Sequence, residues 1–371
     1  MKHCKTIFVL MILGVAGTLI SCGSTKFEGA TMNVLDTSVS RDDFKIVPED
    51  NFDETMKNVV EPKLESIMER GTFASNIGGH RIYYEIFDVE KERGSVVMLH
   101  GFTEFTKKYN ELIYYFTEAG FDVYIMDHFG HGYSERSEAV DGNLSKVAVD
   151  DFDVYVDDAF QFITDVVNKK RDRNKPFVLW GHSMGGGVAT RLLEKYPAQF
   201  DAAILSSPML DIDTGGTPEW IARFVAVSAK AFGAGGNYIF GHDDFTPEEY
   251  FDDPSCSASS YPRYKYAFDL RTENEYYQTN GATWYWLDSA IKATKVARDY
   301  DEAKKVTLPV LMFQAEKDAL VESQGQLEFA SRAKNVNVIF CPETHHEVFN
   351  SPDDIANAYW VTIFDFLDMV L

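Results

Sequence analysis

Residues 177–194 of this chain read FVLWGHSMGGGVATRLLE and decide its fold. The stretch begins as an apolar run, turns sharply at glycines and continues with the spacing of an amphipathic helix. Gly181, Ser183 and Gly185 fill the pattern G-x-S-x-G, the nucleophile elbow, in which a strained strand-to-helix turn presents a serine hydroxyl above a sheet. A side chain at either glycine would collide with the backbone as the chain doubles back. The sequence therefore predicts Ser183 as a nucleophile that faces the positive end of a helix dipole.

Short apolar runs and helical patterns alternate on both sides of this stretch. The runs are rich in Val, Ile and Leu, as expected for parallel strands that are covered on both faces. Residues 81–87 alternate instead, in the manner of a half-buried strand. The alternation predicts an α/β fold with a mostly parallel, doubly wound sheet. The expected strands are residues 81–87, 95–100, 122–127, 177–181, 202–206, 309–314 and 336–341, and the expected helices are 53–70, 109–119, 149–168, 184–195, 324–333 and 352–369.

The alternation is interrupted over residues 210–304, which contain no clear strand run and many aromatic residues. One interpretation is a helical subdomain whose aromatic side chains form its own core. The other is a helical lid that covers the elbow and offers apolar surface to an acyl chain. The two are compatible. An insertion at this point can reach over the carboxyl edge of the sheet, where ligands bind in such folds.

The first 21 residues have the layout of a secretory signal, with lysines at the start and an apolar core over residues 7–15. The ending Leu19-Ile20-Ser21-Cys22 resembles a bacterial lipobox, in which the cysteine is lipidated and becomes the new N-terminus. The alternative, a transmembrane anchor, is disfavoured because the apolar run is short and interrupted by glycine.

We therefore expect a lipoprotein signal peptide at residues 1–21, a lipid-anchored tether at 22–50 and the α/β domain at 51–371. Attachment through Cys22 predicts a location in the bacterial cell envelope, on the periplasmic or extracellular face of a membrane.

The formal net charge of −23 argues against nucleic acid as a partner. Such a charge can serve solubility alone, and we expect a monomer. The predicted compartment would permit a disulfide between Cys256 and Cys341, but we expect two unpaired thiols. No cysteine has neighbours at zinc-binding spacing.

A serine nucleophile needs an imidazole as base, and the imidazole needs a carboxylate to fix its tautomer. In folds built around this elbow the chain order is Ser, then Asp or Glu, then His. Asp318 lies just after an expected strand in PVLMFQAEKDALV, residues 309–321, where a loop can deliver it to the site. Glu316 is its rival, but the Ala-Leu-Val after Asp318 would anchor that residue better.

The base is expected in CPETHHEVFN, residues 341–350, after the last strand. His345 and His346 are adjacent and only one can point inward, and composition does not separate them. Neither has a third ligand at metal-binding spacing.

The tetrahedral intermediate requires backbone donors for its oxygen. One is expected to be the N–H of Met184, directly after the nucleophile. The second is expected from Phe102 in VVMLHGFTEF, residues 96–105, because Gly101 lets the chain turn there.

His128 and His131, in MDHFGHGYSER, could suggest a metal site because they stand three positions apart. We favour a glycine-rich turn whose polar groups hold the loops below the site, since no acidic ligands converge there in the sequence.

Taken together, HGFTEFTKKY, DHFGHGYSER, GHSMGGGVA, AEKDALV and HHEVFN resemble the monoacylglycerol lipase and bacterial lysophospholipase group of α/β-hydrolases. The segment NGATWYWLDSAIKA is similar to the lid of bacterial lysophospholipases, and the resemblance spans residues 75–371. It implies the α/β-hydrolase fold with a helical lid, a Ser183–Asp318–His346 triad and no metal or cofactor. It selects His346 because the family follows its catalytic His with Glu and a bulky apolar residue.

The resemblance implies hydrolysis of single-chain lipid esters, lysophospholipids or monoacylglycerols. Two features depart from the group: Phe102 is bulkier than expected after His-Gly, and a lipid-anchored N-terminus is not typical. The alternatives are a serine aminopeptidase or thioesterase on the same fold, and a lipoprotein that keeps the fold only to bind lipid. Haloalkane or epoxide chemistry is disfavoured, because those enzymes carry Asp where this chain has Ser183.

Overall fold

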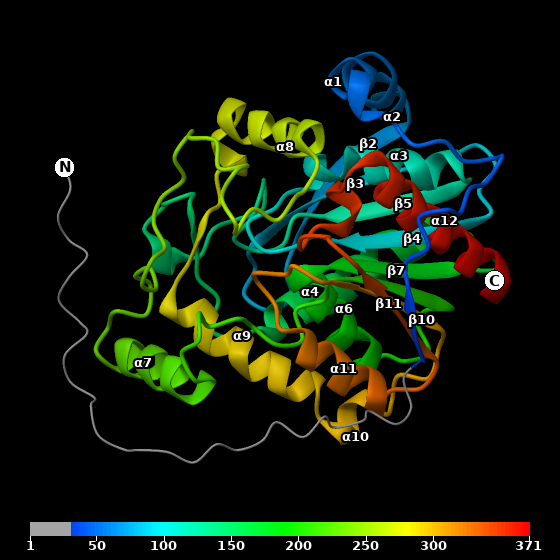
Figure 1. Ribbon diagram of the computed structural model, residues 1–371. Helices are drawn as coiled ribbons and strands as arrows, with labels where there is room; N and C mark the ends of the chain where they lie inside the picture. The colour runs from blue at the N-terminus through cyan, green and yellow to red at the C-terminus, as the bar shows by residue number, and fades with distance from the viewer. Residues whose placement is uncertain (1–30) are drawn as a thin grey trace.

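The computed structural model describes residues 31–371, and its centre is a nine-stranded sheet (Figure 1). The strands follow the order β1-β11-β10-β8-β7-β4-β5-β3-β2. All neighbouring pairs are parallel except β3 with β5 and β2 with β3. The predicted α/β fold with a mostly parallel sheet is therefore confirmed.

The strands that the sequence predicts are found within about one residue of their expected ends. Two edge strands, β1 and β2, are not predicted by the sequence. In β2 the exposed residues dominate, and an edge strand can pair through its backbone without the apolar run that marks a buried one. The strands of the main sheet are β1 Thr31–Val34, β2 Met68–Ala74, β3 Arg81–Phe87, β4 Gly94–Leu99, β5 Phe121–Met126, β7 Phe177–His182, β8 Ala202–Ser206, β10 Val310–Ala315 and β11 Val336–Cys341.

Helices cover both faces of the sheet (Figure 1). One face carries α4 Asp153–Phe162, α6 Ser183–Lys195 and α11 Ser323–Arg332. The other carries α3 Asn110–Glu118 and α12 Asp353–Val370, together with α1 Phe52–Thr55 and α2 Glu61–Ile67, which a π-helical turn at Met56–Val60 joins. The short helix α5 Asn168–Lys170 extends α4 through a second π-helical turn at Ile163–Val167.

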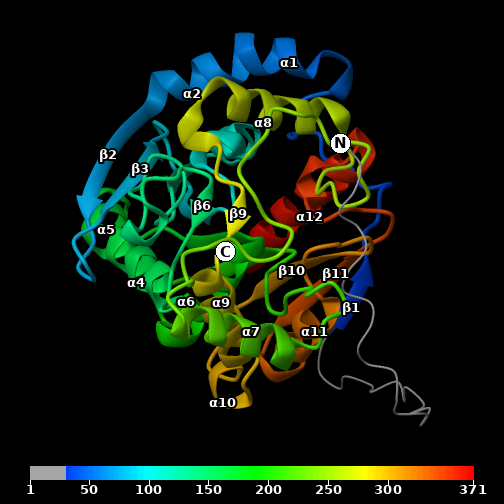
Figure 2. The same cartoon turned by 90° about the vertical axis from the view of Figure 1, so that its left-hand side faces the viewer.

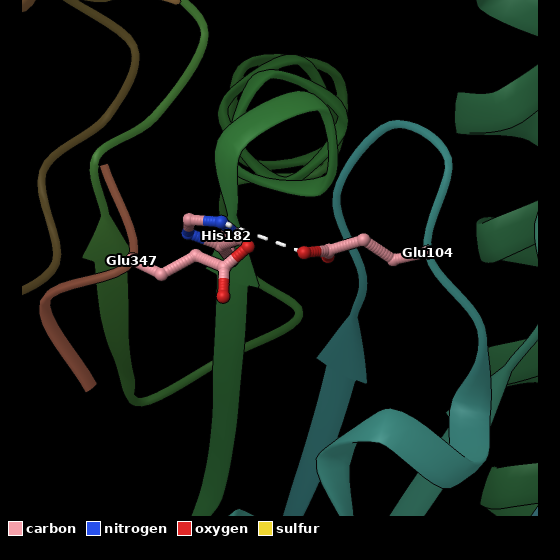
Figure 3. A group of neighbouring side chains, drawn as sticks. All are labelled: Glu104, His182 and Glu347. Carbon is pink, nitrogen blue, oxygen red and sulfur yellow. Dashed lines mark ion pairs between the residues drawn. The ribbon is translucent and has the colours of Figure 1, made fainter. Parts of the chain in front are cut away.

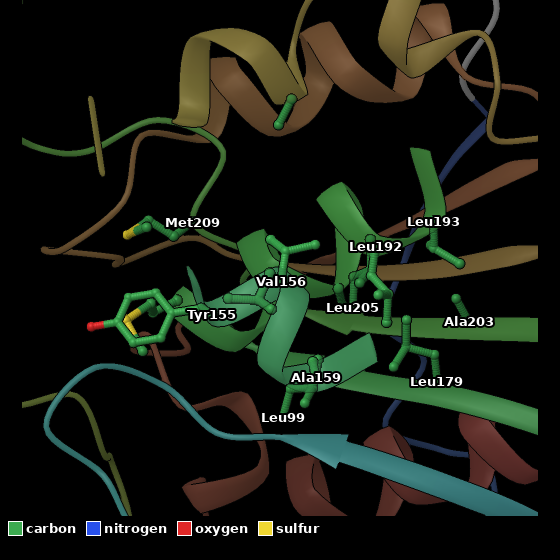
Figure 4. Packing of buried hydrophobic residues seen from close by; sticks show 14 of the residues in the cluster. Leu99, Tyr155, Val156, Ala159, Leu179, Leu192, Leu193, Ala203, Leu205 and Met209 are labelled. Carbon is green, nitrogen blue, oxygen red and sulfur yellow. The ribbon is translucent and has the colours of Figure 1, made fainter. Parts of the chain in front are cut away.

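Side chains that alternate along each central strand fill the two cores. Leu99, Leu179 and Leu205 pack toward α6 and α4, where they meet Leu192 of α6 and Val156 of α4 (Figure 4). Their neighbours along the strands, such as Met98 and Trp180, belong to the cluster on the opposite face. All of these residues are buried, which explains why the strands appear in the sequence as continuous apolar runs.

The stretch after β8 forms a largely helical cap made of two separate parts. Helices α7 Glu219–Ala231 and α9 Trp284–Ala297 pack against each other, followed by α10 Tyr300–Ala303. Helix α8 Tyr261–Glu273 lies apart from them, beside α1 (Figure 2). A two-residue strand, β9 Gly281–Ala282, pairs with β6 Lys146–Val147 and ties the cap to the loop before α4.

The N-terminal segment differs from the expected tether where the structure describes it. Residues 31–34 form β1, which pairs in parallel with β11 at the edge of the sheet. Leu35 and Val47 are buried in the core that α12 covers, and Arg41 forms ion pairs with Asp365 and Asp368. These backbone and apolar contacts hold the segment on the domain. The expected signal peptide and Cys22 lie outside the described residues.

Within residues 31–371, no helix is both long and apolar enough to cross a bilayer. Cys256 and Cys341 are buried and unpaired, as the sequence analysis expects.

Candidate active site

Ser183 occupies a strained turn between β7 and α6. Its φ of +51° lies in the left-handed region, which non-glycine residues rarely adopt. The turn depends on Gly185, where an added Cβ would lie 2.1 Å from the carbonyl oxygen of Leu99. The strain places Ser183 at the carboxyl edge of the sheet, on the wall of a cavity of about 760 Å³.

His346 and Asp318 come together from the loops after β11 and β10. His346 Nδ1 lies 2.7 Å from Asp318 Oδ2, and Asp318 Oδ1 accepts hydrogen bonds from the N–H groups of Leu320 and Val321 at 3.0 Å each. His346 Nε2 is buried and has no hydrogen-bond partner within residues 31–371. His346 and Ser183 line the same cavity, so the nucleophile, base and carboxylate predicted from the sequence meet at one edge of the sheet.

The electrostatics of this pair suit a general base. Burial lowers the pKa of His346, but the charge of Asp318 and its hydrogen bond outweigh burial, so the pKa lies above the ordinary value of 6.5. Burial raises the pKa of Asp318, whereas His346 and two backbone N–H groups lower it, and the net direction is down. Asp318 therefore stays ionised while His346 gains and loses its proton.

The rival residues point elsewhere. His345 Nδ1 lies 2.8 Å from the carbonyl oxygen of Cys256, so its ring is turned toward the cap. Glu316 Oε2 accepts a hydrogen bond from the N–H of Glu343 and is exposed. Of the two histidines, only His346 reaches Asp318.

Phe102 lines the same cavity as Ser183, and Met184 follows Ser183 directly, so both stay predicted as the two backbone donors. Met184 is the second residue of α6, where an N–H has no acceptor in a preceding turn. Phe102 follows the turn at Gly101, and Thr103 has a φ of +62°. The ring of Phe102 packs against Trp286 of α9 with centroids 4.2 Å apart and planes tilted by 37°, so this bulky residue joins the loop to the cap.

His100, His128 and His131 form a buried group under that loop. The N–H of His128 donates to His100 Nε2 at 3.0 Å, and His100 Nδ1 lies 2.8 Å from the carbonyl oxygen of Gly101. Burial lowers the pKa of His100 to about 4 and those of the other two well below their usual range. The three neutral imidazoles support this turn, as expected if its polar groups hold the loops below the site.

The sequence analysis does not identify a buried ionic clamp beside the triad. Lys108 Nζ donates to Glu104 Oε1 at 2.6 Å and to Glu347 Oε1 at 2.7 Å. Glu104 Oε2 accepts the N–H of Gly101 at 2.5 Å, and Glu347 directly follows His346. The clamp therefore joins the loop of Phe102 to the loop of the base. The spacing of Glu104 and Lys108, four residues apart, is a local signal for half of it.

Glu104, His182 and Glu347 converge closely enough to hold a cation (Figure 3). Lys108 already supplies a positive charge to both carboxylates. Burial raises the pKa values of the Glu104 and Glu347 carboxyls. The positive charge of Lys108 lowers these pKa values by more than burial raises them, so both lie below their usual range. His182 donates through Nδ1 to the carbonyl oxygen of Ser206 at 3.0 Å, and burial lowers its pKa to about 4. Lys108 thus balances one of the two negative charges, and with His182 neutral the group keeps one net negative charge.

The cavity above Ser183 has a volume of about 760 Å³ and two kinds of wall. Toward α7 and α9 it is apolar, with Ile212, Val225 and Leu287 among its lining residues. Toward α8 the lining is polar and aromatic and includes Tyr250 and Arg271. Its size and mixed lining are typical of a site for a small amphipathic molecule.

Comparisons with known proteins agree with this geometry. Residues 90–353 match the serine aminopeptidase (S33) family. Lysophospholipase L2 of Escherichia coli is 32% identical over 287 residues, which cover 74% of this chain and 80% of that protein. The monoacylglycerol lipase of Mycolicibacterium smegmatis is 26% identical over 285 residues, 75% of this chain and 90% of that one. A thermostable carboxyl esterase from Bacillus coagulans shares the fold, with a TM-score of 0.67 and 20% identity over 82% of this chain and 98% of that chain.

Proposed function

Because this chain belongs to the serine aminopeptidase (S33) family of hydrolases, we propose that it is a serine esterase of single-chain lipids. Its substrates would be lysophospholipids or monoacylglycerols, the compounds for which its relatives are named. The observation that supports this most strongly is the Asp318–His346 pair. His346 Nε2 has no hydrogen-bond partner among residues 31–371, and the imidazole shares a cavity with Ser183.

In the first half of the reaction, Ser183 Oγ attacks the ester carbonyl while His346 Nε2 takes its proton. Asp318 holds the other ring nitrogen of the imidazole, Nδ1, and balances the positive charge of the ring. The oxyanion that forms accepts hydrogen bonds from the N–H groups of Phe102 and Met184; one such donor typically lowers the barrier by about 3–4 kcal/mol. The intermediate collapses when the C–O bond to the alcohol breaks and His346 gives its proton to the departing oxygen.

The second half repeats these steps with water. His346 Nε2 takes a proton from water, and the hydroxide attacks the acyl carbonyl on Ser183. The same two N–H groups bind the oxyanion, and His346 returns the proton to Ser183 Oγ as the fatty acid leaves. No step needs a metal or an organic cofactor.

The surface of α7 supports a lipid substrate. Ala222 and Val225 face the cavity, whereas Trp220 and Phe224 on the opposite side of the helix are 70% and 68% exposed. Aromatic side chains on an outward helix face are suited to an interface between water and lipid. One helix therefore offers apolar surface both to the acyl chain and to the aggregate that supplies it.

A serine aminopeptidase is less well supported, because it would need a free carboxylate to bind the amine of its substrate. Glu104 and Glu347 line the cavity, but neither is free, because both bond to Lys108, which balances one of their two negative charges. A thioesterase would use the same triad, and a panel of acyl esters, thioesters and peptides separates these activities. A protein that only binds lipid would leave Ser183 unlabelled by a fluorophosphonate probe.

The test compares wild type with Ser183→Ala on a mixed panel of lysophospholipids and monoacylglycerols, with released fatty acids identified by mass spectrometry. We expect fatty acid release by wild type and none by the variant, with equal thermal unfolding of the two proteins. Release by the folded variant would overturn the mechanism.

We also propose that Cys22 is lipidated and holds the protein, as a monomer, at the bacterial cell envelope. The lipobox-like sequence before Cys22 supports this. Since β1 begins at Thr31, the chain between them spans at most roughly 30 Å, so the domain would stay close to the membrane. Mass spectrometry of the mature N-terminus tests the modification, and Cys22→Ala should release the protein from the membrane fraction.

A further inference from the structure

Arg271 is a cation of the cavity wall that lacks an ionic partner. It lies on α8, and its Nη2 donates to the carbonyl oxygen of Thr279 at 2.9 Å and to Asn280 Oδ1 at 3.1 Å. Its Nε is buried and has no hydrogen-bond partner in the described part of the chain. Lys108, the other cation on this wall, pairs with two carboxylates, whereas Arg271 forms no ion pair with any carboxylate of residues 31–371.

The half-buried guanidinium lies 4.4 Å from the ring centroid of Phe245, a cation–π contact that offsets part of the cost of burying its charge but supplies no anion. Arginine side chains are seldom buried unless they are paired, because removing the charge from water is unfavourable. Burial accordingly lowers the pKa of Arg271. The guanidinium has five N–H donors in a planar fork, and both of its hydrogen bonds come from Nη2. The remaining N–H groups can donate hydrogen bonds to an oxyanion such as phosphate, whose geometry matches this fork.

The position of Arg271 identifies the part of a substrate that would reach it. The segment that leads into α8 is bonded to the loop of the base, with the N–H of Glu347 donating to the carbonyl oxygen of Ser257 at 2.8 Å. Arg271 therefore lies on the side of Ser183 where the clamp stands. The apolar wall of α7 and α9 is the other side. With the ester carbonyl at Ser183 and the acyl chain along α7 and α9, the alcohol part of the substrate extends toward α8.

We propose that Arg271 binds the phosphate group of a lysophospholipid and so makes the enzyme select that substrate over a neutral monoacylglycerol. The assignment rests on the proposed function, because Ser183 fixes where the ester lies. The charge of the nearby carboxylates is partly balanced by other groups. Lys108 stands between Glu104 and Glu347, and Ser257 Oγ and Asn350 Nδ2 donate to the oxygens of Glu347.

The test measures kcat/KM for a lysophospholipid and for a monoacylglycerol with the same short acyl chain. We expect Arg271→Gln to lower the ratio of the two values by about 10- to 100-fold, the usual effect of losing hydrogen bonds to a charged group. Arg271→Lys keeps the charge and should retain part of the preference. Glycerol phosphate should compete with the lysophospholipid in wild type and only weakly in Arg271→Gln.

Arg136 provides a matched control. Its Nη2 donates to Thr279 Oγ1 and to the carbonyl oxygen of Tyr276, so it supports the same loop as Arg271. It is not among the residues that line the cavity. Arg136→Gln should therefore leave the ratio unchanged. If Arg271→Gln leaves the ratio unchanged, because it has no effect or because it lowers kcat/KM equally for both substrates, Arg271 only holds the loop and the proposal is wrong.

Two further outcomes are distinguishable. Competition by inorganic phosphate as strong as that by glycerol phosphate would show a site for the free ion and overturn the headgroup assignment. If wild type hydrolyses neither lipid, the proposed function fails. Calorimetric binding of both lipids to Ser183→Ala, with and without Arg271→Gln, then decides the anion site on its own. Binding of the lysophospholipid should weaken by the same 10- to 100-fold, and equal binding by both proteins would contradict the proposal.

Discussion

Replacing Lys108 by methionine tests whether its ammonium holds the two loops of the site together. The side chains of Lys108, Glu104 and Glu347 are only 10%, 7% and 6% exposed, and Lys108 bonds to both carboxylates. Methionine has a similar length and no charge. The variant therefore leaves two buried carboxylates facing each other without a cation.

The structure gives the size of the effect. Removing one partner of a buried ion pair destabilises a protein by about 3–5 kcal/mol. An unfolding entropy of roughly 2.1 cal/mol/K per residue gives about 0.7 kcal/mol/K over residues 31–371. The unfolding midpoint of Lys108→Met should then lie about 4–7 °C below that of wild type at neutral pH.

The loss should depend on pH in a defined direction. In wild type Lys108 holds the pKa values of Glu104 and Glu347 below their usual range, which stabilises the fold above pH 4.5 and not in acid. Without Lys108, burial alone acts and raises both pKa values, so the variant regains stability as the carboxylates take up protons. The difference in midpoint should be largest near about pH 8 and should shrink toward about pH 5.

Differential scanning calorimetry at both pH values measures this, and Lys107→Met is the control. Lys107 is the sequence neighbour of Lys108 and makes no ion pair within the described residues. We also expect Lys108→Met to lose ester hydrolysis at temperatures where it is fully folded, because the loops of Phe102 and His346 are no longer joined. Equal midpoints for the two variants at about pH 8, or a deficit that does not shrink in acid, would refute the clamp.

Three further changes test other parts of the site. Gly185→Ala places a Cβ 2.1 Å from the carbonyl oxygen of Leu99, so we expect misfolding or a large fall in unfolding midpoint, and a normal midpoint would contradict the elbow geometry. Because Asp318 raises the pKa of His346 above 6.5, wild-type kcat/KM on a soluble ester should rise with pH through a midpoint above 6.5, and a midpoint below 6.5 would contradict the assignment. Asp318→Asn should lower kcat by about 10³- to 10⁴-fold. Trp220→Ser should slow hydrolysis of lipid in vesicles several-fold more than hydrolysis of a soluble nitrophenyl ester, and equal slowing would mean that α7 does not contact the lipid surface.

The buried part of the fold is readable from the sequence, and the edges are not. Strands such as Phe177–His182 are buried on both faces and therefore appear as apolar runs. The edge strand Met68–Ala74 is held by backbone hydrogen bonds to its neighbour, and its side chains carry no such signal. The same holds for Thr31–Val34, which the sequence analysis expects to belong to a tether. Pairing at an edge depends on what lies beside the strand, which composition does not record.

Within the site, local patterns indicate single residues, whereas partnerships depend on the folded chain. Ser183 is indicated by its glycines and Asp318 by the strand before it. Residue composition leaves His345 and His346 equivalent, and the structure separates them by the turn that aims one at Cys256 and the other at Asp318. The contact between Lys108 and Glu347 joins residues 239 positions apart, so no local pattern reveals it.

The two parts of the cap are attached to the site in different ways, and this has a consequence for access to the cavity. Residues 256–260, which lead into α8, form backbone hydrogen bonds with the loop of the base: Glu347 N–H to Ser257 O at 2.8 Å and Ser260 N–H to Asn350 O at 2.9 Å. Any movement of this segment would displace His346 from Asp318. Helix α7 instead packs on α9 through apolar side chains and through ion pairs of Arg223 and Lys230 with Asp288, and it exposes its outer face. None of these contacts involves a residue of the triad, so they can separate without breaking a hydrogen bond in it. An acyl chain that enters by displacing α7 would therefore leave the base in place, while α8 keeps a fixed geometry toward the alcohol part of the substrate.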